Sequence, residues 1–155
     1  GKGATFWFTV DLPAVDLVAS APPAIRHLEG KRALLVDDVA VNIAILDDFL
    51  TAWGVETAAA RSTEEALRVF AQQSFDFAIF DYQMAGADGL TLLQRVRETP
   101  AGAQLPVMML TSIDDREPLK AFAALGAAVA TKPIRRDELF AILGELLAAA
   151  PAPAK

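Results

Sequence analysis

Hydrophobic residues along this chain fall into short apolar runs that alternate with longer amphipathic segments. Four apolar runs cover residues 33–36, 55–59, 105–110 and 127–130, and a further one, rich in aromatic residues, ends at Asp81. After each run, apolar residues recur three or four positions apart, which is the spacing of one face of a helix. The pattern therefore predicts five strands, each followed by a helix.

Capping signals mark the ends of several of these helices. Gly54 and Gly126 follow two of the amphipathic segments, and glycine commonly ends a helix. Ser62 and Glu65 form a capping box, in which the serine hydroxyl and the glutamate satisfy exposed backbone N–H groups. The fourth helix is expected to begin in a stretch whose negative charge suits the positive end of its dipole, at Asp114, Asp115 and Glu117.

Strict alternation of strands and helices is typical of a parallel sheet with helices on both faces, connected by right-handed crossovers. We expect an α/β fold, a flavodoxin-like (βα)5 doubly wound five-stranded parallel sheet, over residues 31–150. The inward positions of its third helix are predicted to be Leu90, Leu93 and Val96. Those of the last helix, residues 135–149, are predicted to be Leu139, Ile142, Leu143, Leu146 and Leu147.

The remaining parts of the chain look different in composition. Residues 1–12 place a glycine turn before a strand-like aromatic run, residues 13–30 are rich in Pro and Ala and are interpreted as a linker, and residues 151–155 form a tail. The only histidine, His27, is interpreted as a plain linker residue. Because the chain begins with Gly1 rather than Met, we expect it to be a piece of a longer protein.

Composition excludes several functions. The 155 residues carry a formal net charge of -6, which argues against a nucleic-acid surface, and they include no Cys for a disulfide or thiolate metal site. Since no apolar run approaches the length of a membrane span, no membrane contact by this segment is expected. We expect a cytoplasmic location, although the parent protein can carry a membrane anchor elsewhere.

Polar residues stand where the predicted strands end. Asp37 and Asp38 follow the first strand, Asp81 ends the third, Thr111 follows the fourth and Lys132 follows the fifth. The carboxyl ends of parallel strands share one edge of the sheet, so these side chains should gather there. Three carboxylates in a small space repel one another unless a cation is present, and Mg²⁺ prefers such oxygen ligands.

The two other polar groups suit a phosphoryl group. Lys132 offers a compact positive charge for a phosphate oxygen, and the Thr111 hydroxyl can donate to another. An aspartate can then act as a nucleophile and form an aspartyl phosphate. Taken singly, Asp37 or Asp38 is more often a helix N-cap, Thr111 a loop hydroxyl and Lys132 a surface charge. Their joint placement favours the phosphoryl site.

The chain resembles the receiver domain of two-component response regulators. The resemblance covers residues 31–150 and is carried by VDDVAVN at 36–42, DYQMAGADG at 81–89, TS at 111–112 and KP at 132–133. It implies that Asp81 is the phosphoacceptor and that Asp37 and Asp38 hold Mg²⁺ together with the backbone carbonyl of Gln83. It further implies that Thr111 is a switch hydroxyl, that Lys132 binds the phosphoryl group and that the Lys132–Pro133 bond is cis.

Three positions depart from the family pattern. Val39 stands where many members have Asn, Ala85 replaces the usual Pro after Met84, and Val129 occupies the position of the aromatic switch residue. The predicted chemistry survives these changes. The output is affected, because Thr111 cannot pull an aromatic ring inward when that position carries valine.

Residues 1–12 resemble the last glycine motif and closing strand of the ATP-binding domain of sensor histidine kinases. With the receiver motifs, this predicts the C-terminal receiver of a hybrid sensor histidine kinase. Its expected partners are a histidine kinase dimerisation domain or a histidine phosphotransfer protein. The fragment lacks the rest of an ATP site, so we expect no kinase activity, only self-phosphorylation from small donors and slow autodephosphorylation.

The same fold also serves other functions. A phosphorylation-independent interaction module remains the alternative, although the intact acidic pocket speaks against it. A phosphatase with an aspartyl nucleophile would need a second aspartate at position 83, where Gln83 stands. Flavin binding would need a phosphate-binding loop where Asp37 and Asp38 would repel the phosphate.

Overall fold

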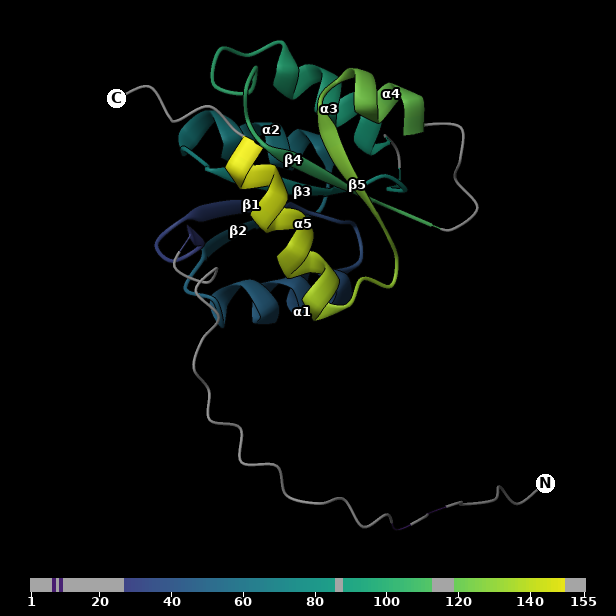
Figure 1. Cartoon of the computed structure of the whole chain (residues 1–155). Coiled ribbons are helices and arrows are strands. Elements are labelled where there is room, and N and C mark those ends of the chain that lie inside the picture. Colours follow the sequence, from purple (N-terminus) through teal and green to yellow (C-terminus); the bar gives the residue numbers. More distant parts are fainter. Residues whose placement is uncertain (1–6, 8, 10–26, 86–87, 113–118, 150–155) are drawn as a thin grey trace, which may run out of the picture.

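A five-stranded parallel sheet with helices on both faces forms the body of the protein (Figure 1). The computed structural model describes residues 7, 9, 27–85, 88–112 and 119–149. The strands, in the order β2-β1-β3-β4-β5, are β1 (Arg32–Val36), β2 (Glu56–Ala60), β3 (Phe77–Asp81), β4 (Val107–Thr111) and β5 (Ala127–Thr131). The helices are α1 (Ala40–Thr51), α2 (Thr63–Gln72), α3 (Gly89–Arg97), α4 (Leu119–Ala124) and α5 (Arg136–Ala149). The predicted doubly wound flavodoxin-like fold is confirmed.

Two hydrophobic clusters lie on opposite faces of the sheet. Successive strand residues point to opposite faces, so Leu35 and Ile79 pack with α1 and α5, whereas Leu34 and Phe80 pack with α2, α3 and α4. Figure 1 shows this division, with α1 and α5 on one side of the strands and the other three helices on the opposite side. Strands β3 and β4 are buried along their whole length and form the centre of both clusters.

The predicted helix caps are largely confirmed. Ser62 is the N-cap of α2, and its side chain accepts a hydrogen bond from the Glu65 N–H. The second bond of the capping box differs from the prediction by one residue. The Glu65 side chain accepts from the backbone N–H of Arg61 rather than from that of Ser62. Gly54 and Gly126 follow their helices with positive φ values of 78° and 66°, a conformation that favours glycine.

The helix faces agree with the sequence pattern in part. In α5, Leu139 and Leu143 are buried and the other three predicted residues are partly buried. In α3, Leu92 is fully buried in addition to Leu93 and Val96, while Leu90 is only partly buried. The apolar residues of α1 divide between two faces: the inner face buries Leu46 and Leu50, whereas Val41 and Ile45 are exposed.

The folded body begins a few residues before Lys31. Leu28 is buried within the α1/α5 cluster, and the Gly30 N–H donates to the Gly54 carbonyl at 2.9 Å. The predicted acidic start of the fourth helix and most of the N-terminal strand, linker and tail lie outside the described residues. In the described part of the chain, no helix is long and apolar enough to cross a membrane.

Candidate functional site

The carboxyl ends of the strands are tied together by backbone hydrogen bonds just beyond the sheet. The Asp37 N–H donates to the Ala60 carbonyl, and the Lys132 N–H donates to the Thr111 carbonyl at 2.8 Å. The Tyr82 N–H donates to the Leu110 carbonyl at 2.9 Å. These bonds fix the residues at the strand ends relative to one another. All the residues that the sequence placed there therefore come to a common edge.

The ammonium group of Lys132 lies between two carboxylates. Its Nζ is 2.8 Å from Asp37 Oδ2 and 2.8 Å from Asp81 Oδ2. The Asp37 and Asp81 side chains are 2% and 5% exposed, and that of Lys132 is 25% exposed. Lys132 thus joins β1, β3 and the end of β5 through one charged group.

Asp37 is held by four hydrogen bonds. Its Oδ1 accepts from the Val39 N–H at 2.8 Å, and Asn42 Nδ2 donates to both carboxylate oxygens, at 3.2 and 3.0 Å. Lys132 provides the fourth bond. A buried carboxylate needs such partners, since burial without them is costly. The orientation of Asp37 is therefore fixed by its own loop and by the first turn of α1.

Asp38 is half-buried and is bonded at both its side chain and its backbone. Its Oδ2 accepts from the backbone N–H of Ala85 at 2.8 Å, from the loop after β3. Its carbonyl accepts from the Arg61 guanidinium, at 2.9 Å from Nη2 and 3.3 Å from Nε. Asp38 consequently connects the loops after β1, β2 and β3.

The remaining predicted residues lie beside these acids. Thr111 is 1% exposed at the end of β4, and the predicted cis peptide between Lys132 and Pro133 is confirmed. Gln83 is in the loop after β3, where its N–H donates to Asp81 Oδ1 at 3.3 Å and its Oε1 accepts from Ser112 Oγ at 3.2 Å. A role of the Gln83 carbonyl as a metal ligand stays a prediction.

The electrostatics of the site follow from burial. Burial raises the pKa of Asp81, and the hydrogen bond and charge of Lys132 only partly offset that effect. Burial alone would lower the pKa of Lys132, but its hydrogen bonds and charge attraction to Asp37 and Asp81 outweigh burial, so the pKa is raised. Lys132 is therefore a cation at neutral pH.

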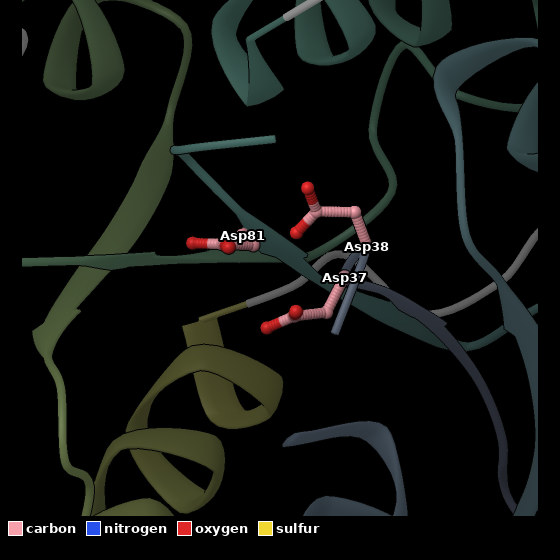
Figure 2. Close-up of side chains that lie close together, drawn as sticks. All are labelled: Asp37, Asp38 and Asp81. Carbon is pink, nitrogen blue, oxygen red and sulfur yellow. The ribbon is translucent and has the colours of Figure 1, made fainter. Parts of the chain in front are cut away.

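The three acids can converge on one cation. One carboxylate oxygen from each of Asp37, Asp38 and Asp81 lies within 4.8 Å of the others, and the three side chains extend from neighbouring strand ends toward a shared space (Figure 2). Oxygen donors at this spacing suit a hard divalent ion such as Mg²⁺, which keeps several of its water ligands. The donor set of this chain thus fits the metal that the sequence predicted.

Sequence reasoning missed several residues that shape the site. Asn42 ends the VDDVAVN motif, and its polar side chain on the first turn of an apolar helix was a usable signal. Arg61 carried no such signal, because its acceptor is a backbone carbonyl. Gly89 packs so closely that a Cβ there would lie 2.1 Å from the Asp81 carbonyl oxygen.

An aromatic contact links the site to α4. Tyr82 directly follows Asp81, and its ring meets Phe122 of α4 edge-on, with a centroid distance of 5.4 Å and an interplanar angle of 76°. Phe122 is fully buried, and Val129 is partly buried in the same cluster. The end of β3 therefore contacts α4 directly.

The fold and this acidic, lysine-containing edge define the class of protein. Residues 33–144 match the family model described as the response regulator receiver domain, and the chain belongs to that family. It is therefore a CheY-like receiver domain of two-component signalling.

Among its relatives is sensor histidine kinase AruS of Pseudomonas aeruginosa, which is 32% identical over 155 residues. That match covers 98% of this chain and 15% of AruS. Chemotaxis protein CheY4 of Vibrio cholerae superimposes with a TM-score of 0.71 and 26% identity, covering 75% of this chain and 98% of that one. The receiver domain of sensor histidine kinase PA1611 from Pseudomonas aeruginosa, solved with a magnesium ion in its active site cleft, shares the fold at a TM-score of 0.70 and 24% identity, covering 77% of this chain and 99% of that one.

Proposed function

We propose that Asp81 of this receiver domain accepts a phosphoryl group from a phosphohistidine, with Mg²⁺ held by Asp37, Asp38, Asp81 and the Gln83 carbonyl. The observation that carries the proposal is the position of Lys132 Nζ, 2.8 Å from both Asp37 and Asp81, beside three convergent carboxylates. Lys132 together with a bound divalent cation would offset the three carboxylate charges, so that a phosphoryl group could lie next to a carboxylate nucleophile.

The chemistry assigns a role to each side chain. A carboxylate oxygen of Asp81 forms the new bond to phosphorus while the bond from phosphorus to the donor nitrogen breaks and its electron pair leaves with the donor. Lys132 is placed to bind a phosphoryl oxygen, and the Thr111 hydroxyl can donate to another. Bound Mg²⁺ supplies charge neutralisation for the transferred group. No protein base is required, because the attacking group is the ionised carboxylate of Asp81, which carries no proton to remove.

The parent protein is proposed to be a hybrid sensor histidine kinase. In support, the match to AruS extends over nearly the whole chain, including the N-terminal residues that resemble the end of a kinase ATP-binding domain. The proposed partners are then a histidine kinase dimerisation domain or a histidine phosphotransfer protein, in the cytoplasm. Kinase activity itself would reside elsewhere in the parent.

Mass spectrometry after incubation with acetyl phosphate and Mg²⁺ tests the phosphoacceptor. The parent chain should gain one phosphoryl group, and Asp81→Asn should gain none. Asp76→Asn is a matched control, because Asp76 precedes the other end of β3 and bonds Lys31 and Arg32 there; it should be labelled like the parent. Labelling that persists in Asp81→Asn would defeat the assignment. An unlabelled parent that still folds and binds Mg²⁺ would favour the phosphorylation-independent interaction module.

A further inference from the structure

The strongest unexplained feature is the way Asp38 is held from two sides. The Ala85 N–H bonds its carboxylate at 2.8 Å, across 47 positions of the sequence, and Arg61 bonds its carbonyl through two guanidinium nitrogens. Asp37 and Asp81 are both bonded by Lys132. The bonds to Asp38 come instead from the loops after β3 and β2.

The bond from position 85 depends on the residue found there. Proline has no backbone N–H, so the proline that receiver domains usually carry after this methionine could not make it. Alanine in this chain supplies the donor. The departure from the family pattern at Ala85 therefore adds a hydrogen bond to an acid of the site.

The geometry leaves Asp38 able to bind a cation while this bond persists. A carboxylate has about four lone-pair positions on two oxygens, and the Ala85 N–H occupies one of them on Oδ2. Hydrogen bonds of this kind orient metal ligands and reduce the rotamer freedom that is lost when the metal binds. The bond from Arg61 fixes the backbone on which the same side chain rotates.

We propose that the Ala85 N–H and the Arg61 guanidinium are positioning groups that hold Asp38 in its cation-binding orientation before Mg²⁺ arrives. The proposal rests on the proposed function in one respect, namely that Asp38 is a metal ligand. It adds that this receiver domain has a preorganised metal site that depends on a non-proline residue at position 85.

Calorimetric titration with Mg²⁺ measures the effect of removing the donor. Ala85→Pro removes the N–H, and Ala85→Ser keeps it. We expect the dissociation constant of Ala85→Pro to rise on the order of tenfold, whereas that of Ala85→Ser stays close to the parent value. The acetyl phosphate labelling rate of Ala85→Pro should rise as the Mg²⁺ concentration is raised, because the substitution weakens metal binding. Arg61→Lys retains the charge but loses the two-nitrogen fork, and should show a smaller loss of affinity.

Amide hydrogen exchange tests the bond in the metal-free protein and does not depend on proline being tolerated. The Ala85 amide should exchange more slowly in the parent than in Asp38→Ala, which lacks the acceptor. The Gly89 amide, bonded to the Tyr82 carbonyl at 2.9 Å, should exchange equally in both proteins and serves as the internal control.

The outcomes of these experiments distinguish the metal site itself from the positioning role of Ala85 and Arg61. A parent chain that binds no Mg²⁺ would overturn both the metal site and the positioning role. Mg²⁺ binding that is normal in the parent and unchanged in a folded Ala85→Pro would overturn only the positioning role and leave the phosphoacceptor proposal intact. Equal exchange of the Ala85 amide in the parent and Asp38→Ala would also overturn it.

Discussion

Replacing Gly89 by alanine should disrupt the packing between the end of β3, which carries Asp81, and the first turn of α3. A Cβ at this position would lie 2.1 Å from the Asp81 carbonyl oxygen and 2.8 Å from Cε of Met109. The first distance is more than an ångström short of the 3.4 Å at which ordinary contact begins. The Met109 side chain can move aside, but the Asp81 carbonyl is backbone and belongs to a fully buried strand. The first turn of α3 must therefore move away from β3.

The cost of Gly89→Ala has two parts. Overpacking of a closely packed contact costs about 1–3 kcal/mol. Displacing α3 also stretches the hydrogen bond from the Gly89 N–H to the Tyr82 carbonyl, now 2.9 Å long, and such a bond contributes about 1 kcal/mol. We expect the free energy of unfolding to fall by about 2–4 kcal/mol, measured by urea denaturation. Acetyl phosphate labelling of the folded fraction should also slow, because the Asp81 backbone shifts.

Two other glycines provide matched controls for this substitution. Gly144 lies in α5 with no atom within 4 Å of an added Cβ, so Gly144→Ala should raise the free energy of unfolding by about 0.5–1 kcal/mol through helix propensity. Gly102, after α3, has the Val96 carbonyl oxygen 2.1 Å from an added Cβ, so Gly102→Ala should destabilise the fold as Gly89→Ala does. Unlike Gly89, Gly102 does not contact Asp81, and labelling of the folded protein should remain normal. A Gly89→Ala variant as stable as the parent would refute the packing argument.

Three further predictions concern charged groups. Lys132→Ala should lower the free energy of unfolding of the metal-free protein by about 1–3 kcal/mol, because the buried carboxylates of Asp37 and Asp81 lose their shared hydrogen-bond donor. Urea denaturation should then show a larger stabilisation by Mg²⁺ than in the parent, and labelling by acetyl phosphate should be mostly lost. Labelling kinetics equal to the parent would show that Lys132 does not bind the phosphoryl group. In the metal-free protein, burial raises the pKa of Asp81, so the folded state binds its proton more tightly than the unfolded chain. Stability should therefore decrease as the pH rises from the ordinary aspartate pKa through the raised pKa, and Asp81→Asn should remove that decrease in a pH series of denaturation curves. Arg97→Met should cost about 1–3 kcal/mol, since Arg97 donates to the carbonyls of Gly102, Leu105 and Leu125, and calorimetry should find Mg²⁺ affinity unchanged.

The fold was predictable because the apolar runs and the helical periodicity of the sequence indicate the same order of elements. Apolar runs of strand length alternate with helical periodicity five times, and few topologies satisfy that order. Strand limits were less accurate, because an apolar residue such as Val55 is buried without belonging to β2. The pattern of α1 could not show which side faces the sheet, since Val41 and Leu46 are equally apolar but only Leu46 is buried.

The candidate site was predictable in part, because a parallel sheet brings the carboxyl ends of its strands to one edge. Asp81 and Lys132 lie far apart in sequence, and parallel pairing alone places both at one edge of the sheet. The support around Asp38 could not be predicted, because its partners include a backbone amide and a guanidinium that bonds a carbonyl. Any non-proline residue carries such an amide, so the sequence does not indicate which one will be used.

The contact between Tyr82 and Phe122 gives the end of β3 a mechanical connection to α4. Because Tyr82 is bonded covalently to Asp81, a rotation of that peptide would tilt the Tyr82 ring against the fully buried ring of Phe122. The helix would have to follow the ring. In this domain, which has valine at position 129, a displacement of the Asp81 backbone would therefore reach α4 through Tyr82 and its contact with Phe122.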